Sequence, residues 1–309
     1  MRINAASVSL SVILFAAAVQ LNAGSGLPHT WVSATGDDGN TCAFAQPCLT
    51  LAAAIEATAA GGEVSFMNSG DFAAAATVTI TKSIIIAATG VQAGFLTKDL
   101  DGIVINAGAD DVVVLRGLDI VSQGSTAGAD HRGIKFEAGG VLFVEDCRVT
   151  GFTKRGISIE SSTDNAKAFI SNTIVRNQTN NGIVINPPSV NNVVVMDHVQ
   201  VVNSTAIGLA VNPGGRVDVT NSTFSHNAGA GVWATGPAAL SLESSLITDN
   251  GVGLELLAGA AARLSNVNVA GNTIGFSTAG GALNSFGNNH ATGNTDNAVP
   301  TINTHLSPL

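Results

Sequence analysis

A short segment with alternating apolar positions recurs along the chain. It begins with glycine, places apolar residues one and three positions later, and often ends in a polar residue. Eight copies start at Gly102, Gly133, Gly156, Gly182, Gly208, Gly231, Gly253 and Gly275. Because successive side chains of a strand point to opposite faces, the two apolar positions of each copy share one face. The pattern predicts a series of short strands with one buried face.

The spacing of these glycines predicts a coiled repeat. The first interval, from Gly102 to Gly133, is the longest, and the later intervals are nearly equal at roughly two dozen positions each. This period is too short for a strand, a full helix and two loops, but it fits one coil of three short strands. A second apolar strand follows several glycine segments, at residues 141–144, 193–196, 217–219 and 240–242. We therefore expect an all-β solenoid, a single-stranded right-handed parallel β-helix, over residues 63–297.

Two polar columns accompany the repeat. The third strand of each coil is expected to end at an asparagine, at Asn177, Asn203, Asn227, Asn250, Asn272 and Asn294. Stacked amides can bond from coil to coil, and asparagine tolerates a left-handed turn, so these residues are interpreted as a structural ladder.

The second column lies four positions after each glycine and holds Glu137 and Glu160 in neighbouring coils. Two such carboxylates can share a proton or a cation, or both can extend into water. Screening of exposed charges favours the second alternative.

Both ends of the repeat carry segments that differ from it. Residues 49–60 (LTLAAAIEATAA) are rich in helix formers and stop at two glycines, which predicts a short capping helix. The first strands are expected at residues 64–66, 78–80 and 84–87. We expect an N-terminal cap over residues 24–62 and a tail over residues 298–309 that covers the last coil, because open strand edges invite aggregation.

Residues 1–23 have the pattern of a cleaved secretory signal. Arg2 precedes an apolar stretch of about a dozen residues, shorter than the roughly 20 that cross a bilayer. No later apolar run has spanning length, so we expect no membrane span in a mature protein that is secreted, periplasmic or at the cell surface. Loss of Arg2 changes the net charge from −9 to −10, and no basic cluster remains. Nucleic acid is therefore not an expected partner.

Three cysteines fit an exported chain. Cys42 and Cys48 lie close together in a segment rich in Gly and Asp, and a disulfide between them is expected in an oxidising compartment. Cys147 lies within a repeat and is interpreted as a small core residue. The cysteines and histidines lack the spacing of a metal site, so no metal is expected.

Residues 30–64 (TWVSATGDDGNTCAFAQPCLTLAAAIEATAAGGEV), followed by the repeats, resemble exported bacterial right-handed β-helix proteins of the pectin-lyase-like superfold. The resemblance covers nearly all of the mature chain and implies the fold and export. Many members of this group have no assigned activity. The enzymatic relatives use clustered carboxylates beside one sheet, with Ca²⁺ and a basic residue in lyases and paired Asp residues in hydrolases.

This chain departs from those enzymes on the row where such a site is expected. The outward positions of the glycine strands hold no acid pair; they are Val104, Lys135, Ser158, Val184, Ala210, Trp233, Glu255 and Ser277. Asp197-His198 matches a dipeptide of pectate lyases, but the residues before it are Val-Met instead of Trp-Ile, which favours coincidence. Asp37-Asp38 precedes the repeats and is assigned to the cap.

Two constellations remain as candidate sites. His226 and Asp249 each precede a ladder asparagine and are expected to be neighbours, as a base with its orienting acid or as a surface hydrogen bond. Charged residues also concentrate in the early coils, beside an insertion at residues 123–131. The candidate acidic-sugar site there consists of Arg132, Glu137, Arg155 and Glu160, and its alternative is a solvated charged face.

The sequence favours a non-catalytic binding or structural scaffold whose partner is a glycan or another surface protein. The alternative is a polysaccharide lyase or hydrolase acting on an acidic glycan. Only the lyase alternative implies a cofactor, namely Ca²⁺. The mature chain has Trp31 and Trp233 but no tyrosine, which weighs against a site that stacks sugar rings.

Overall fold

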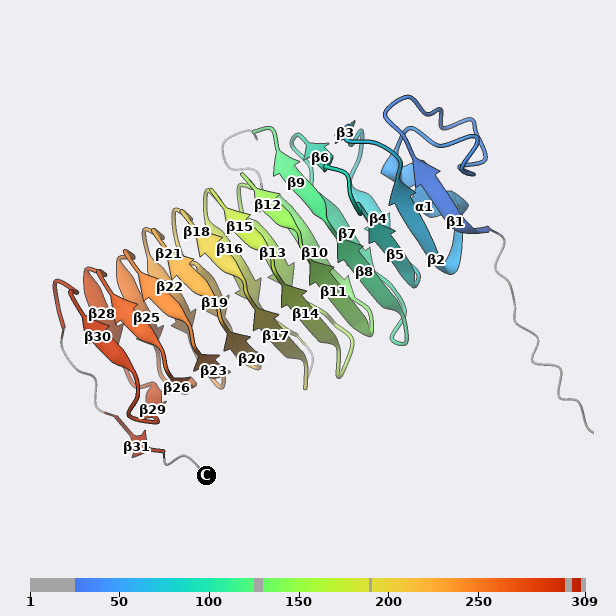
Figure 1. The fold of residues 1–309 in the computed structure, drawn as a ribbon. Helices are drawn as coiled ribbons and strands as arrows, with labels where there is room; N and C mark the ends of the chain where they lie inside the picture. The colour runs from blue at the N-terminus through green and yellow to red at the C-terminus, as the bar shows by residue number, and fades with distance from the viewer. Residues whose placement is uncertain (1–25, 125–129, 189–190, 298–301, 307–309) are drawn as a thin grey trace, which may run out of the picture.

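The protein is a right-handed parallel β-helix of about ten coils, as its computed structural model shows (Figure 1). The structure describes residues 26–124, 130–188, 191–297 and 302–306. The expected signal segment, and the centre of the expected insertion loop, lie outside these residues. Each complete coil contributes one strand to each of three parallel sheets, so the all-β solenoid predicted from the repeat is confirmed.

The largest sheet has twelve strands. In spatial order they are β1 (Leu27–Val32), β2 (Thr58–Phe66), β5 (Ile84–Ala87), β8 (Val112–Arg116), β11 (Val141–Glu145), β14 (Lys167–Ser171), β17 (Val193–Asp197), β20 (Arg216–Thr220), β23 (Ala239–Glu243), β26 (Ala261–Ser265), β29 (Ala282–Ser285) and β31 (Thr304–His305).

The glycine segments form most of a nine-stranded sheet. Its strands are β4 (Val78–Ile80), β7 (Ile103–Asn106), β10 (Arg132–Ala138), β13 (Arg155–Ile159), β16 (Asn181–Ile185), β19 (Leu209–Val211), β22 (Ala230–Ala234), β25 (Val252–Leu256) and β28 (Ile274–Ser277).

A ten-stranded sheet completes the coils. It consists of β3 (Gly70–Ala73), β6 (Ala93–Thr97), β9 (Leu118–Ser122), β12 (Arg148–Thr150), β15 (Ile174–Arg176), β18 (Gln200–Val202), β21 (Thr223–Ser225), β24 (Leu246–Thr248), β27 (Asn268–Ala270) and β30 (His290–Thr292).

The inward positions of the glycine segments form the core, as expected. Ile134 and Phe136 are fully buried, and so are their equivalents in the next coil. Glycine is required at the start of these segments because neighbouring strands and coils approach closely there. A Cβ on Gly182 would lie 2.2 Å from Cγ1 of Val201 on β18 and 2.7 Å from the carbonyl oxygen of Gly208 in the next coil. A side chain at this position would therefore push neighbouring strands apart.

Beside the glycines runs a buried amide ladder. The Nδ2 of Asn227 donates to Oδ1 of Asn250 at 2.9 Å, and the same bond continues at 3.0 Å to Asn272 and on to Asn294. Each Oδ1 also accepts the backbone N–H of the preceding asparagine. Nearly every polar atom of the ladder is thus satisfied inside the protein, as burial requires.

The first two expected members of this ladder were assigned wrongly. Asn177 and Asn203 lie outside the core, in the left-handed conformation, and bond to each other at 2.9 Å. The buried column is occupied in those coils by the next residues, Gln178 and Ser204. Asparagine suits both a buried ladder and a left-handed turn, so residue type alone did not separate the two columns.

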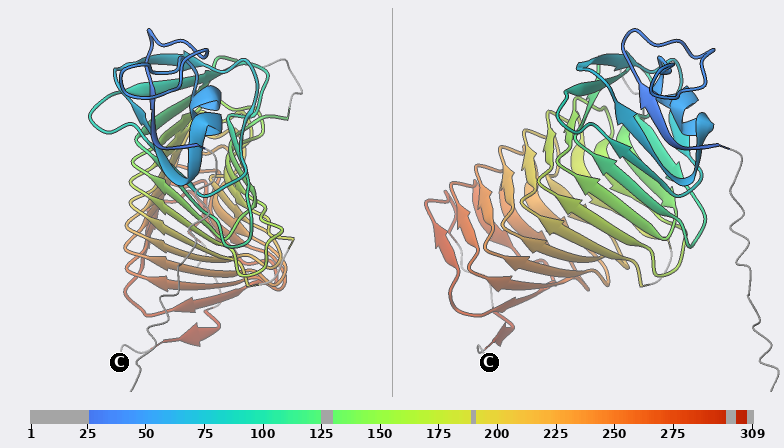
Figure 2. Two further views of the ribbon diagram at one scale, coloured as in Figure 1. Left: turned by 90° about the vertical axis from the view of Figure 1, so that its right-hand side faces the viewer. Right: turned by 45° about the vertical axis from the view of Figure 1, so that its right-hand side comes forward.

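The single helix of the described residues, α1 (Leu51–Ala57), contacts β1, β2 and β4 at the N-terminal end (Figure 2). Thr50 begins it, because its Oγ1 accepts the N–H of Ala53 at 3.2 Å. The expected helix extended to residue 60, but the chain becomes extended at Thr58 and continues as β2. Among the described residues no helix has the length and apolarity needed to cross a membrane.

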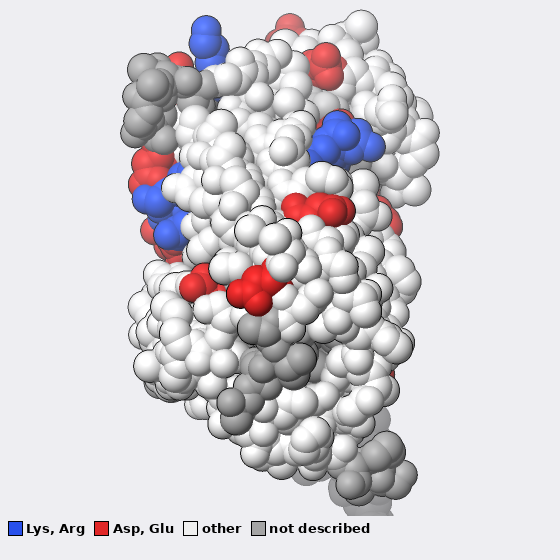
Figure 3. All heavy atoms as spheres, turned by 90° about the vertical axis from the view of Figure 1, so that its left-hand side faces the viewer, with Lys and Arg blue, Asp and Glu red and all other residues white. Residues whose placement is uncertain are grey.

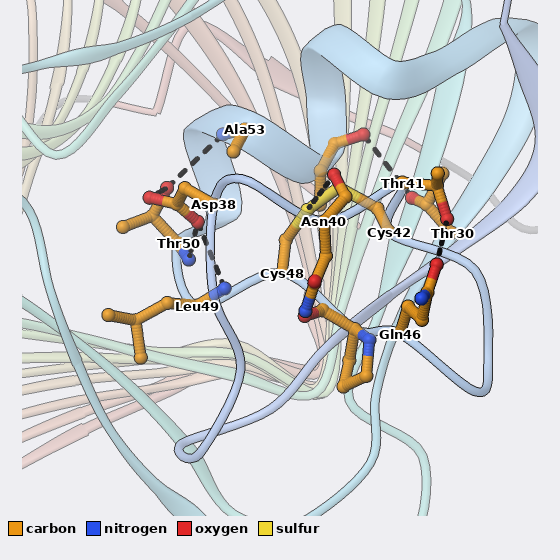
Figure 4. The surroundings of a disulfide bond; sticks show 12 residues. Thr30, Asp38, Asn40, Thr41, Cys42, Gln46, Cys48, Leu49, Thr50 and Ala53 are labelled. Atoms are coloured by element: carbon orange, nitrogen blue, oxygen red, sulfur yellow. Dashed lines mark hydrogen bonds between the residues drawn. A yellow bond between two sulfur atoms is a disulfide. The ribbon is translucent and has the colours of Figure 1, made fainter.

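A disulfide between Cys42 and Cys48 holds a loop against the outermost strand (Figure 4). Trp31 N donates to Cys42 O at 2.8 Å, and Cys48 N donates to Trp31 O at 2.9 Å. Asp38, placed in the cap by the sequence, accepts bonds from the N–H groups of Leu49 and Thr50. The outer edge of β1 is therefore hydrogen bonded to this loop, which supports the proposal that residues up to 62 act as an N-terminal cap.

We expect Asn250→Ala to lower the free energy of unfolding by about 3 kcal/mol, because it leaves the backbone N–H of Asn227 without its acceptor and removes the bonds between the Asn250 side chain and the neighbouring ladder amides. Urea unfolding followed by circular dichroism measures this. The matched control is Asn203→Gly, which keeps the left-handed turn and removes only an exposed bond. Equal losses in the two variants would contradict a special role of the buried column.

Replacement of both Cys42 and Cys48 by serine is expected to cost about 2 kcal/mol, as the closure entropy of so short a loop predicts. The same loss is expected when a reductant is added to the unmodified protein. A reductant should have no effect on the double variant, whose thiols are absent. If neither treatment changes the urea midpoint, the loop does not stabilise the end of the solenoid.

Candidate functional site

The four charged candidates of the early coils lie on or beside two neighbouring strands. Arg132 on β10 is in direct register with Arg155 on β13, and Glu160 follows β13. Glu137 lies at a shift in the pairing of β10 with β7. The structure therefore brings this quartet together on the outer side of the nine-stranded sheet.

Glu160 contacts both arginines of the quartet, and Nε of Arg132 lies 3.9 Å from its Oε1. Its Oε1 accepts bonds from Nη1 of Arg155 and, at 2.8 Å, from the fully buried Oγ of Ser158. Arg155 Nη1 also donates to Ser158 Oγ at 2.9 Å. Burial lowers the pKa of Arg155, and the positive charge of Arg132 lowers it further. Arg155 and Glu160 thus form a largely buried ion pair.

Glu137 has a different partner, Lys135 Nζ at 2.8 Å. The two carboxylates therefore bind different side chains, Glu137 that of Lys135 and Glu160 those of Arg155 and Ser158. Each has its own cationic partner, an arrangement that neither of the two alternatives drawn from the sequence described.

The surrounding charges balance. Lys154 and Arg132 both contact Asp130, and the backbone N–H of Arg132 donates to Asp101 at 2.6 Å. Burial lowers the pKa of Lys154, although Asp130 opposes this shift. Together the cluster contains four basic residues, Arg132, Lys135, Lys154 and Arg155, and four acidic residues, Asp101, Asp130, Glu137 and Glu160. Acidic and basic side chains lie intermixed along one flank of the molecule (Figure 3).

No three His, Cys, Asp or Glu side chains of the described ranges are grouped so that they could hold a metal ion.

His226 and Asp249 lie side by side in neighbouring coils, but Nε2 and Oδ2 are 3.9 Å apart and both side chains are more than half exposed. They belong to the left-handed column that also contains Gly151, Asn177, Asn203, Gly271 and Gly293. The pair has the geometry of a loose surface contact.

Asp197 and His198 lie at the bend between the twelve-stranded and the ten-stranded sheets. Asp197 accepts bonds from Thr220 Oγ1 at 2.8 Å and Asn221 Nδ2 at 2.9 Å, and contacts His198 Nδ1 at 2.9 Å. These bonds, those from Asn221 and His198 foremost, lower the pKa of Asp197 to about 2. Its carboxylate is therefore ionised at neutral pH and exposed at the surface.

The outward row of the nine-stranded sheet is less open than expected. Val104, Ser158, Val184 and Ala210 are buried, which leaves Lys135, Trp233, Glu255 and Ser277 partly exposed. Half of the row on which chemistry was sought is therefore closed to a substrate.

The sequence analysis missed an apolar surface on the outer face of the twelve-stranded sheet. It is formed by alternate residues of β5, β8, β11, β14 and β17 that are not buried in the core; we call it the apolar patch. Its members are Ile85, Val112, Val114, Val141, Phe143, Phe169, Val193 and Val195. The rings of Phe143 and Phe169 stack at 5.0 Å with an interplanar angle of 14°.

A signal for this patch is present in the sequence. Strands β8, β11 and β17 read VVVLR, VLFVE and VVVMD, apolar on both faces, whereas β20 reads RVDVT and alternates. A strand that is apolar on both faces is typical of a sheet covered on both sides. Helix α1 lies at the N-terminal end, and its main contacts are with β1, β2 and β4 instead of the strands of the patch.

The same outer face carries two further features. At its N-terminal end His29 stacks on Trp31 with ring centroids 4.3 Å apart, and Trp31 meets the exposed ring of Phe44 edge-on at 5.1 Å. Toward the C-terminal end a shallow groove of about 290 Å³ is lined by small apolar and polar residues, the polar ones including Asp218, Ser241 and Arg263. The face therefore changes from aromatic to apolar to polar along the solenoid.

Comparison with known proteins agrees with this architecture. The family described as "Right handed beta helix region" matches residues 207–306. No curated protein matches the chain by sequence. Among solved structures, the complex of XylC with xylose superposes with a TM-score of 0.64 at 10% identity and covers 85% of this chain and 70% of its own.

Two lyases superpose as well. A pectate lyase gives a TM-score of 0.58 at 14% identity, covering 83% of this chain and 74% of its own. A rhamnogalacturonan lyase gives 0.53 at 14% identity, with coverage of 79% and 74%. At these identities the likeness concerns the fold. The chain is a right-handed parallel β-helix protein with a pectate lyase-like fold.

Proposed function

We propose that this protein is an exported, non-catalytic β-helix scaffold that binds another molecule through its outer surface. The observation that carries the proposal is the pairing of the candidate acids and bases. Glu160 is bonded to Arg155 and Ser158, and Glu137 to Lys135. These are the side chains that a polysaccharide lyase or hydrolase would need to keep available.

Acid–base catalysis requires a titratable group that reaches the substrate and whose pKa lies near the working pH. An ion pair of Glu160 with a guanidinium favours the charged carboxylate and so opposes service as a general acid. A substrate at Glu160 would also have to replace two hydrogen bonds. Both effects weigh against catalysis at the quartet.

Export is supported by two independent features. The Cys42–Cys48 disulfide is typical of proteins that fold in an oxidising compartment. Residues 1–23 have the charge and apolar pattern of a secretory signal. Together they favour a secreted, periplasmic or surface location.

The partner is either a glycan or another protein. The structures that share the fold include proteins named as lyases and one solved with xylose, and these names keep a glycan among the candidates. The apolar patch favours a protein surface, because exposed apolar side chains gain most by contact with other apolar side chains. We therefore place a protein partner first.

We expect no turnover of polygalacturonate or alginate, with or without Ca²⁺. The ultraviolet absorbance of unsaturated products detects a lyase, and the release of reducing ends detects a hydrolase. Measurable turnover that is lost in Glu137→Ala or Arg155→Ala would overturn the scaffold proposal and establish the enzymatic alternative.

The quartet is instead expected to contribute stability. Glu160→Gln leaves Arg155 without its carboxylate and should lower the free energy of unfolding by about 2 kcal/mol. Glu255→Gln, a partly exposed position of β25 in the same sheet, is the matched control and should change it by less than about 0.5 kcal/mol. Urea unfolding measures both; equal effects would contradict a structural role of the pair.

A further inference from the structure

The apolar patch occupies a defined part of the twelve-stranded sheet. Across β8, β11, β14 and β17 its central row reads Val114, Phe143, Phe169, Val195 in direct register. A second row reads Val112, Val141, Lys167, Val193. The central row continues into Ile85 on β5 at one end and into Asp218 on β20 at the other, so the apolar character ends at β20.

The core does not explain this patch. Strands β20, β23 and β26 stack in the same sheet over the same kind of interior, yet their outward positions are polar or small. The inward positions of both groups are buried and apolar. The apolar outer residues of β8 to β17 are thus unnecessary for coil stacking, and their Val and Phe side chains gain from removal from water.

On β8 to β17 the central row reads Val, Phe, Phe, Val, which is the same order from either end. The middle of this pattern lies between the stacked rings of Phe143 and Phe169. A two-fold axis through this point, parallel to the strands, would place each coil of one copy over a coil of another. Such an interface uses the same patch on both subunits, as two-fold dimers do.

We propose that the partner of the apolar patch is a second copy of this chain, packed face to face with its solenoid axis antiparallel. In this arrangement Phe143 lies over Phe169 of the second copy, and Val114 over Val195 of the second copy. The two sheets form a sandwich with the spacing of about 10 Å that is usual for stacked sheets.

The charged rim fits the same arrangement. Along the third row of the outer face, β8, β11, β14 and β17 carry Arg116, Glu145, Ser171 and Asp197. The two-fold axis brings Arg116 opposite Asp197 of the second copy and Glu145 opposite Ser171 of the second copy. Arg116 is paired with Glu145 at 2.8 Å but is half exposed, and Asp197 is ionised, so opposite charges meet across the rim.

Lys167 is the one charged residue within the two apolar rows. It is exposed and lies opposite Val141 of the second copy. Its aliphatic stem can cover this valine while the ammonium group reaches water at the rim.

The size of the patch suits a dimer that dissociates. Four strands at about 4.8 Å and three rows of alternate residues, the charged third row included, cover roughly 400 Å². A standard interface buries about 800 Å² on each partner, with an apolar core inside a polar rim. The patch supplies such a core, and Arg116, Lys167 and Asp197 belong to the rim.

Sedimentation velocity of the mature chain over a wide concentration range tests the proposal. A monomer–dimer equilibrium is expected. Phe169→Asp should raise the dissociation constant about 100-fold, because it buries a charge in the centre of the interface. Asn268→Asp adds the same charge at an exposed position of β27 in the ten-stranded sheet and should leave the dissociation constant unchanged. A wild-type chain that stays monomeric at every concentration, or a Phe169→Asp variant that dimerises normally, would overturn the proposal.

The arrangement has its own test, which does not depend on the folding of the Phe169 variant. Val114→Cys and Val195→Cys chains, mixed and treated with a short bis-maleimide, should cross-link to each other and much less to themselves. The native Cys147 is buried and should not react. Efficient cross-linking of each variant with itself would contradict the antiparallel two-fold contact. So would an equal yield of cross-linked product when Val114→Cys is mixed with Ser241→Cys instead of Val195→Cys.

The dimer does not rest on the scaffold proposal, because turnover assays and sedimentation report different properties. A catalytically active dimer would overturn only the proposed function. A non-catalytic monomer would overturn only the inferred dimer.

Discussion

The close contact between successive coils at the turn into the nine-stranded sheet is the constraint on which the rest of the fold depends. Glycine is needed there because a Cβ would meet the valine of one neighbouring strand and the carbonyl group of the next coil. The amides of Asn227, Asn250, Asn272 and Asn294 fill the adjacent column and bond to one another and to buried backbone groups. Once these contacts set the register, every side chain of a coil lies over its equivalent in the next.

This strict stacking gives each outer face a row structure. Charges from neighbouring coils are brought within bonding distance, so Arg116 meets Glu145 and Arg148 meets Asp119. The same stacking brings Phe143 over Phe169 and joins the valines of β8, β11 and β17 into a continuous surface. Charged side chains that pair with each other are less available to a substrate, whereas a continuous apolar surface favours association. Both features support the proposed binding scaffold.

Much of this could be predicted from periodicity. The glycine spacing and the inward apolar positions led to the correct fold, and the strands at residues 78–80 and 84–87 fall where expected. The ladder was right from Asn227 onward and wrong at Asn177 and Asn203. The interval from Asn203 to Asn227 is one position longer than the interval from Gly208 to Gly231. That difference marks the change of column, because a shift by a single position moves a side chain from the core to the surface.

The sequence by itself determined which residues face the core, because burial of apolar side chains imposes a periodic pattern that is local along the chain. Only the tertiary structure decided what the outward residues do, because their surroundings come from neighbouring coils and turns. It separated Glu137 from Glu160 by giving each its own cation, and it buried Ser158 and Val184 on a row expected to be open. It also assembled the apolar patch from strands of successive coils, which lie far apart along the chain, so no single segment reveals the surface.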